Sequence, residues 1–304
     1  MKVYVSGATG FVGSHVAREL REQGAEVRDE RVDLLDSDAL ERVIEGCDAV
    51  VHVAALYSYD APELEFERVN VEGTRTILAA ALAKGVRRFL HTSTAGTCGP
   101  VPGAIATEED EPPEWELTVP YKRTKLESER LALAAGAVVV NPTTPVGEGD
   151  AKPTPTGQMI VDFLNRRMPA YVDTGLNLID VRDVARGHLL AAKKGRVGER
   201  YILGNRDLTL QEILETLSRL SGLPAPKVRL PHAIPLVFGA VSSAAARITG
   251  RPPRVSLDSV RMSMHRMFFD AGKAVRELGL PQTPIEEPLA RAVEWFRAKG
   301  YVRG

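Results

Sequence analysis

Apolar and polar positions follow two alternating periods over the first 141 residues. Short β-branched runs are separated by longer stretches in which apolar residues recur with helical spacing. We expect strands at residues 2–6, 26–28, 49–53, 89–93 and 138–141, and helices at residues 10–22, 37–45, 62–84 and 120–135. This alternation is typical of parallel strands joined by crossover helices, so it predicts a doubly wound α/β sheet.

The pattern changes after Asn141. Residues 142–157 are rich in Pro, Thr and Gly, and the remainder mixes brief strands with helices. A strand and a helix near 178–203 return to the earlier pattern. Helices are expected at 183–194, 210–221, 236–248, 255–264, 273–278 and 284–299. We therefore expect residues 142–304 to form mainly a smaller mixed α/β substrate lobe over the carboxyl edge of the sheet, where open α/β sheets bind ligands.

Composition narrows the class of protein. The 304 residues carry a net charge of −1, so the basic footprint of a nucleic-acid binder is missing. The two cysteines, Cys47 and Cys98, form no CxxC pair, and no His, Asp and Glu cluster has metal-ligand spacing, so we predict neither disulfides nor a metal site. No apolar run reaches the length of a signal core or membrane span. We expect a cytoplasmic protein that acts on a small molecule.

A glycine-rich segment, SGATGFVGSH, joins the first expected strand to the first expected helix. Glycines in this position permit a tight turn and a close approach of a pyrophosphate to the helix N-terminus, whereas a plain glycine-rich turn is the simpler interpretation. We expect Thr9 to cap the turn. The segment predicts a Rossmann-type domain over residues 1–141 that binds NAD or NADP, with contacts from Gly7, Thr9, Gly10, Phe11, Val12 and Gly13.

Tyr121 and Lys125 stand four residues apart at the start of an expected helix, so their side chains share one face. An ammonium beside a phenol stabilises the tyrosinate, which proton transfer near neutral pH requires. Such a pair alone is more often a solvated helix face. The hydroxyl-rich run HTSTAGT at 91–97, which ends an expected strand, favours the catalytic interpretation.

The GxxGxxG spacing, the TSTAG run and the Tyr-x-x-x-Lys pair together resemble the short-chain dehydrogenase/reductase superfamily. The resemblance implies that Thr94 hydrogen-bonds the reacting oxygen, with Ser93 as the neighbouring alternative. It also implies that Tyr121 acts as the acid or base and that Lys125 holds the nicotinamide ribose as well.

Further contacts follow from the same resemblance. Asn70 matches a helix residue that steadies the active site, and Tyr57, Tyr59 and Thr143 are candidates for substrate contact. The additional implied cofactor contacts are Asp33, Leu34, Val53, Ala54, Ala55, Thr92, Pro142 and Thr144. At the second strand, Arg28, Asp29, Glu30 and Arg31 offer both an arginine for a 2′-phosphate and acids for a free ribose hydroxyl. We include Arg28 among the cofactor candidates, and the choice between NAD and NADP stays open.

Longer runs narrow the resemblance to the extended branch of the superfamily. VNVEGTRTILAAALAKGV, NPTTPVG and GERYILG are similar to the hopanoid-associated sugar epimerase and dihydroflavonol-4-reductase-like group. The chain has TPVG where nucleotide-sugar enzymes carry a YGP-like turn, which favours a smaller or more apolar substrate. The region of the second strand is also shorter than in that group.

Several remaining polar residues have ordinary structural interpretations. We expect Asp183 to cap the helix that follows it. Isolated arginines such as Arg182, Arg261 and Arg266 are usually surface ion-pair partners, although they could grip an anionic substrate. The run at 264–269, which includes His265, is expected to be core packing.

Three functions remain open. The leading hypothesis is an NAD(P)-dependent oxidoreductase acting on a secondary alcohol or ketone. The second is a sugar epimerase or dehydratase that keeps its dinucleotide bound, and the third is a non-catalytic dinucleotide sensor, which could dispense with Tyr121 and Lys125. Pairing of two copies through the helices at 62–84 and 120–135 is the dimer mode that the resemblance implies.

Overall fold

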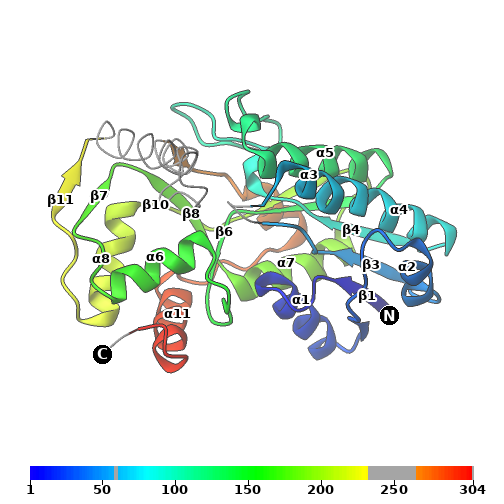
Figure 1. Ribbon diagram of the computed structural model, residues 1–304, viewed down its shortest axis with the longest axis horizontal. Helices are drawn as coiled ribbons and strands as arrows, with labels where there is room; N and C mark the ends of the chain where they lie inside the picture. Colours follow the sequence, from blue (N-terminus) through cyan, green and yellow to red (C-terminus); the bar gives the residue numbers. More distant parts are fainter. Residues whose placement is uncertain (58–60, 232–264, 303–304) are drawn as a thin grey trace.

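The computed structural model describes residues 1–57, 61–231 and 265–302 (Figure 1). The helices expected at 236–248 and 255–264 lie outside the described residues. The main sheet consists of six parallel strands in the order β2-β1-β3-β4-β5-β9, with β9 from the C-terminal half of the chain and the other five from the N-terminal half. Its strands are β1 Lys2–Ser6, β2 Glu26–Arg28, β3 Ala49–His52, β4 Arg88–Thr92, β5 Val138–Pro142 and β9 Arg200–Leu203. The five strands expected in this half are confirmed to within one residue at each end.

Helices cover both faces of this sheet (Figure 1). Because successive strand residues point to opposite faces, Val3 and Val5 pack on one side and Tyr4 packs on the other. The first face is covered by α1 Phe11–Glu22 and α7 Val181–Lys194, and the second by α2 Ser37–Ile44, α4 Gly73–Ala83 and α5 Pro120–Ala134. The Rossmann-type doubly wound architecture is therefore confirmed.

The helix expected at 62–84 is divided into three parts. It begins as α3 Glu63–Phe66, continues as the π-helix η1 Glu67–Glu72, and ends as α4. A π-turn is rare and often marks a functional position, and this one carries Asn70. Periodicity alone does not predict the change in hydrogen bonding.

Among the described residues, the second lobe combines two small sheets with three helices (Figure 1). One sheet contains β6 Thr144–Val146, β8 Gly175–Asp180, β10 Arg206–Thr209 and β12 Arg266–Met267, and the other pairs β7 Ala170–Val172 with β11 Val228–Leu230. Its helices are α6 Pro155–Leu164, α8 Leu210–Ser221 and α11 Glu286–Ala298, with the short π-helix η4 Ala274–Leu278 beside the main sheet. Helices α6, α8 and α11 share an apolar core of Ile160, Phe163, Leu217, Leu289 and Phe296.

Helix α6 was not among the expected helices. Its first residue is Pro155, and the Thr154 hydroxyl accepts a hydrogen bond from the Gly157 amide. Pro at the first helical position and Thr at the N-cap are favourable for a helix start. The Pro-, Thr- and Gly-rich composition that indicated a loop therefore includes a helix cap.

Candidate active site

The turn between β1 and α1 has almost no room for side chains. Gly7 has a φ of +73°, and a Cβ atom added to it would lie 2.6 Å from the amide nitrogen of Ala54. A Cβ on Gly13 would lie 2.1 Å from the Gly7 carbonyl oxygen, which also accepts a hydrogen bond from the Gly10 amide at 3.0 Å. Bare backbone at these positions is what allows a phosphate to approach the helix closely.

The expectation that Thr9 caps this turn is wrong. The N-cap of α1 is Gly10, and no side chain accepts a hydrogen bond from the first turn of the helix. The extended conformation of Gly10, with a φ of −82° and a ψ of 172°, starts the helix without a capping hydroxyl. The helix N-terminus, with its partial positive charge, therefore suits an anion.

The tip of β2 is occupied by contacts within the protein. Arg28 donates from Nη1 to the carbonyls of Val43 and Glu45 at the end of α2, both at 2.9 Å. Asp29 pairs with Arg21 of α1 at 2.7 Å. Arg28 and Asp29 both bind other groups of the protein, so their geometry favours neither NAD nor NADP.

The residues expected at the adenine differ in their surroundings. The carboxylate of Asp33 is exposed and accepts a hydrogen bond from the Leu35 amide at 3.0 Å. The side chain of Leu34 is buried in the core against α4, and a Cβ on Gly73 would lie 2.9 Å from its Cβ. The adenine contacts of both residues stay predictions.

Asn70 fixes the loop that follows β3. Its Oδ1 accepts a hydrogen bond from the Leu56 amide at 2.7 Å, and its Nδ2 donates to the Leu56 carbonyl at 3.2 Å and to the Thr124 hydroxyl at 3.1 Å. Thr124, which the sequence analysis did not single out, lies on α5 between Tyr121 and Lys125. Asn70 thus connects the expected cofactor loop of Val53, Ala54 and Ala55 with the helix that carries the catalytic pair.

A buried histidine supports the same loop through the Ser6 hydroxyl. His52 Nδ1 lies 2.7 Å from the Ser6 hydroxyl, and His52 Nε2 lies 3.1 Å from the Thr74 hydroxyl. The Ser6 hydroxyl also accepts the Ala54 amide at 3.2 Å. Burial lowers the pKa of His52 to about 3, so the imidazole is neutral.

Lys125 meets the end of β4, and Tyr121 lies one helical turn before it on α5. Lys125 is 2 % exposed, and its Nζ donates a hydrogen bond of 2.7 Å to the Thr92 carbonyl. Burial lowers the pKa of Lys125 to about 8, against an opposing effect of the negative charge on Glu129. One turn earlier, the Tyr121 ring packs edge-on against Tyr57, with ring centroids 4.6 Å apart. Tyr57 is 45 % exposed, as a residue at a pocket mouth would be.

The two hydroxyls at the strand exit have different environments. Thr94 is half-buried and is the N-cap of the 3-10 helix η2 Ala95–Thr97, where its Oγ1 accepts the Gly96 amide at 3.2 Å. Ser93 is buried, and its Oγ has no hydrogen-bond partner among the described residues. The greater exposure of Thr94 favours it over Ser93 as the group that meets a substrate.

The remaining expected contacts line the ends of β4 and β5. The Thr92 hydroxyl lies 2.9 Å from Nε2 of the buried His188. Pro142 ends β5 and Thr144 begins β6, while Thr143 between them donates from its amide to the Leu203 carbonyl at 3.0 Å. This segment carries the chain from the main sheet into the second lobe.

A buried ionic network behind η2 was not predicted. Glu129 of α5 is fully buried and pairs with Arg200 of β9 at 2.8 Å. Its other oxygen accepts hydrogen bonds from the Thr97 hydroxyl at 2.6 Å and from Asn141 Nδ2 at 2.8 Å. The signal in the sequence is the spacing of Glu129, which is one further helical turn beyond Tyr121 and Lys125.

The other polar candidates have structural roles. The capping role expected for Asp183 is wrong: Asp180 is the N-cap of α7, and Asp183 instead accepts the Thr283 amide at 2.8 Å. Arg182 pairs with Glu148, and Arg266 pairs with Asp173. Tyr59 and Arg261 lie outside the described residues.

The run around His265 is only partly core. Phe269 is buried in the main core. His265 stacks on Trp115, with ring centroids 4.3 Å apart, and therefore joins the second lobe to the segment that precedes α5.

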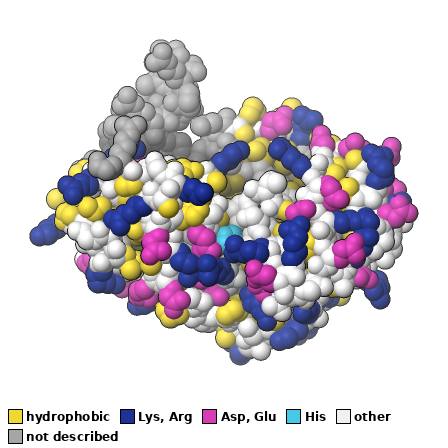
Figure 2. Space-filling view, turned by 90° about the horizontal axis from the view of Figure 1, so that it is seen from below, with side chains coloured by type: hydrophobic (Ala, Val, Ile, Leu, Met, Phe, Trp, Pro, Cys, Tyr) yellow, Lys and Arg dark blue, Asp and Glu magenta, His cyan; other side chains and the backbone are white. Residues whose placement is uncertain are grey.

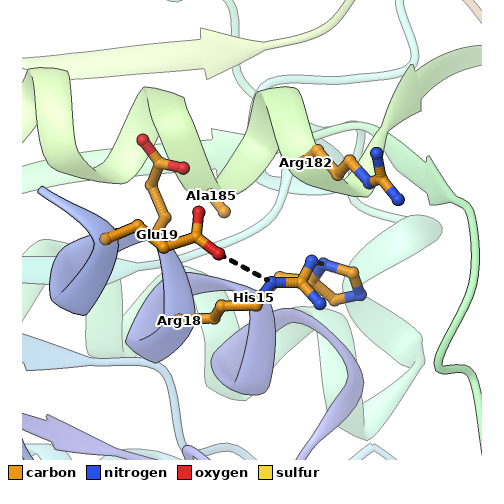
Figure 3. Close-up of a pocket in the computed structure, with 6 residues that line it drawn as sticks. His15, Arg18, Glu19, Arg182 and Ala185 are labelled. Atoms are coloured by element: carbon orange, nitrogen blue, oxygen red, sulfur yellow. Dashed lines mark hydrogen bonds and ion pairs between the residues drawn. The ribbon is translucent and has the colours of Figure 1, made fainter.

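A separate cavity of about 330 Å³ lies between α1 and α7 (Figure 3). It is lined by residues of both charges, and Arg18 Nη2 lies 2.6 Å from His15 Nδ1. The face shown in Figure 2 likewise intersperses acidic and basic side chains, without a single-sign patch. The predicted cofactor contacts do not include the cavity's lining residues, which are His15, Arg18, Glu19, Glu22, Arg182 and Ala185.

The bare first turn and the buried lysine one helical turn after a tyrosine define an α/β enzyme with a dinucleotide site. Residues 3–204 match the NAD dependent epimerase/dehydratase family, and the chain belongs to that family. Among the described residues, no helix is long and apolar enough to span a membrane.

Relatives of known name are similar over nearly the whole chain. A Synechocystis protein named "Putative dihydroflavonol 4-reductase" is 45% identical and aligns with 99% of this chain and 96% of its own length. Sterol demethylase protein B of Methylococcus capsulatus is 33% identical, with coverage of 99% and 100%. The family and the dihydroflavonol-4-reductase-like resemblance are therefore confirmed.

Solved structures agree with the fold. The crystal structure of gox2253 is 37% identical, covers 99% of both chains and has a TM-score of 0.86. A dTDP-glucose 4,6-dehydratase of Streptomyces venezuelae, crystallised with NAD, is 25% identical, covers 98% of this chain and 97% of its own, and has a TM-score of 0.77.

Proposed function

We propose that the protein is an NAD(P)-dependent oxidoreductase that interconverts a secondary alcohol and a ketone. The observation that carries the proposal is Lys125, a fully buried lysine held on the Thr92 carbonyl one helical turn from Tyr121. Burying an ammonium is costly, so its retention at this place indicates a use for its charge. The names of the relatives include several reductases, among them a farnesyl-quinoline ketoreductase of Stigmatella aurantiaca, 27% identical.

The residues of the first turn fit a dinucleotide. A Cβ on Gly7 or Gly13 would collide with the backbone of Ala54 or of Gly7 itself, so the turn stays tight only with glycine at both positions. The first turn of α1 has no capping side chain, which leaves its amides available to a pyrophosphate. We propose that Lys125 holds the nicotinamide ribose. The nicotinamide, when bound, supplies or accepts the hydride.

The proton chemistry belongs to three side chains. In the reducing direction, Tyr121 donates its phenolic proton to the substrate oxygen as that oxygen gains negative charge, and Thr94 donates a hydrogen bond to the same oxygen. The Lys125 ammonium stabilises the resulting tyrosinate. Tyr57, beside the Tyr121 ring, would border the substrate at the pocket mouth.

A second candidate function is epimerisation or dehydration of a sugar derivative with a retained dinucleotide. A nucleoside-diphosphate-sugar epimerase of Pseudomonas aeruginosa, 26% identical with a TM-score of 0.78, favours this alternative. The same residues would then move the proton away and back within one turnover, while the retained dinucleotide would supply the acceptor and donor of the hydride. Net consumption of free reduced nicotinamide distinguishes the two functions.

The test begins with thermal melts in the presence of NAD, NADH, NADP or NADPH. A ligand that binds the native state raises the melting temperature by mass action. We expect one oxidised and reduced pair to give the larger shift, and that pair is then supplied with ketones of increasing apolar size while reduced nicotinamide is followed by absorbance. Steady consumption supports the reductase. Nucleotide released only on denaturation, without net consumption, supports the epimerase, and binding of none contradicts both.

A further inference from the structure

Glu129 is placed to act on two residues of the proposed mechanism, Thr94 and Lys125. It lies four residues after Lys125 on α5, and its carboxylate faces the turn that carries Thr94. We propose that Glu129 is a positioning residue: it holds the Thr94 turn in place and sets a negative charge one helical turn from the Lys125 ammonium. This inference rests on the proposed function.

Two donors connect Glu129 to the Thr94 turn. The Thr97 hydroxyl lies 2.6 Å from Glu129 Oε2 and 2.7 Å from the Thr94 carbonyl oxygen, and these two acceptors share its single proton. Asn141 Nδ2 lies 2.8 Å from the same carboxylate oxygen and 3.2 Å from the same carbonyl. Because η2 has only three residues, its own backbone bonds are few, and these side chains hold the Thr94 backbone, while the Thr94 hydroxyl itself accepts the Gly96 amide.

The charge of Glu129 acts on Lys125 through the protein interior, since both side chains are almost fully buried. His52 of β3 and His91 of β4 also face Lys125, but burial lowers the pKa of both imidazoles, so they are neutral. Glu129 supplies the negative charge that opposes the effect of burial on the lysine. A carboxylate one turn away therefore favours the ammonium form of Lys125.

A purely structural role for this carboxylate is a weaker account. A buried ion pair such as that of Glu129 with Arg200 contributes little net stability compared with well-packed apolar residues. While Oε1 of Glu129 pairs with Arg200, its Oε2 accepts hydrogen bonds from Thr97 and Asn141, the two side chains that hold the Thr94 turn. Burying the Glu129 carboxylate removes it from water, which is unfavourable. Its hydrogen bonds are made to the side chains that hold the Thr94 turn.

The first test is a double-mutant cycle between Thr97→Val and Thr94→Ala. Valine is close in shape to threonine and removes the bridging hydroxyl without leaving a charge unpaired. We expect Thr97→Val alone to lower kcat by about tenfold to about 100-fold and to leave dinucleotide affinity within about twofold. In the Thr94→Ala background it should have no further effect on kcat, because the hydroxyl that it positions is gone.

Stability provides the internal control of this cycle. The Thr97 hydroxyl contacts the Thr94 carbonyl, which alanine retains, so the loss of melting temperature from Thr97→Val should be the same in both backgrounds. An equal fold-loss of kcat in both backgrounds would overturn the positioning role and leave Thr97 as a structural residue.

The second test measures binding in place of turnover. In a Tyr121→Phe background no tyrosinate forms, and affinity for the reduced dinucleotide selected by the melts is titrated against pH. We expect affinity to fall as Lys125 loses its proton at about pH 8, and to fall at lower pH when Glu129→Gln is added. The exposed Glu127→Gln is the matched control on the same helix and should leave the midpoint unchanged. An unmoved midpoint in Glu129→Gln contradicts the electrostatic role.

The two proposals fail in different ways. If Tyr121→Phe retains full turnover, the proposed function fails. If Tyr121→Phe is inactive while the cycle is additive and the binding midpoint is fixed, the proposed function stands and only the role of Glu129 fails.

Discussion

The two sides of the carboxyl edge of the main sheet are built on opposite requirements. Around the β1–α1 turn, the site needs missing side chains, since a Cβ on Gly7 or Gly13 would meet backbone atoms. Around α5 and β4, it needs side chains that are costly to bury, namely Lys125 and Glu129. The first side is sensitive to one added methyl group, and the second to one lost charge.

This contrast separates stability from function. On the glycine side, the backbone that would meet a phosphate also packs β1 against β3. A substitution that disturbs this backbone should therefore reduce both dinucleotide binding and stability. On the α5 side, a polar group can be exchanged for an apolar one of similar size with little harm to packing. Mutations should therefore uncouple activity from stability only on the second side.

The largest expected effect is on the glycine side. Gly7→Ala adds both a collision at 2.6 Å and a left-handed φ, whereas Gly24→Ala, at a φ of +80°, adds only the unfavourable φ. We expect the free energy of unfolding to fall by at least about 3 kcal/mol for Gly7→Ala and by about 1 kcal/mol for Gly24→Ala. Urea denaturation measures both, and equal losses would contradict the account of the turn.

Lys125→Met should show the opposite behaviour. Burial lowers the folded-state pKa of Lys125 to about 8, so the ammonium destabilises the fold below that pH, and stability rises as pH increases from about 8 toward the ordinary value of 10.5. We expect Lys125→Met to lose turnover by at least about 100-fold, while matching or exceeding the parent in melting temperature at neutral pH. The rise in stability above pH 8 should be smaller in the variant. A variant that unfolds at neutral pH would show that Lys125 supports the structure.

A smaller effect concerns acid stability. Burial lowers the pKa of His188 to about 4, below its unfolded value of 6.5, so stability falls as pH decreases between those two values. One such histidine contributes a slope of up to about 1.4 kcal/mol per pH unit. His188→Gln should reduce the slope between pH 6.5 and 4, measured by urea denaturation at a series of pH values. An unchanged slope would mean that His188 is not a neutral buried group.

The smallest effect is expected at the exposed ion pairs. Arg182 and Glu148 pair at 2.9 Å beside the cavity of Figure 3, but the Arg182 side chain is 53% exposed. We expect Arg182→Ala to change the free energy of unfolding by less than about 1 kcal/mol and kcat by less than about twofold. A large loss of activity would assign the α1–α7 cavity a role in the reaction.

Much of the main sheet could be predicted because β1, β3 and β5 are short runs rich in valine and lie between turn residues. The π-turn at Asn70 and the start of α6 could not, because the first depends on tertiary contacts with Leu56 and Thr124, and the second begins inside a composition typical of loops. Local pattern gives the element type, while the hydrogen bonds that refine it come from distant residues.

The candidate site was predicted unevenly for the same reason. Tyr121 and Lys125, and the glycines of the first turn, have sequence spacings that by themselves predict a shared helix face and a dinucleotide-binding turn. Glu129 also has helical spacing, but its partners Asn141 and Arg200 lie on strands β5 and β9, and only the sheet order brings them together. Thr9 failed as a cap because Gly10 adopts the extended N-cap conformation.

The most direct test of the central claim is Tyr121→Phe, with turnover and dinucleotide affinity measured on the same preparation. The phenol proton is the proposed acid, whereas the dinucleotide is bound mainly by the glycine turn and Lys125. We predict a loss of kcat of about 100-fold to about 10,000-fold, with dinucleotide affinity within about threefold of the parent. Full activity in Tyr121→Phe would contradict the mechanism.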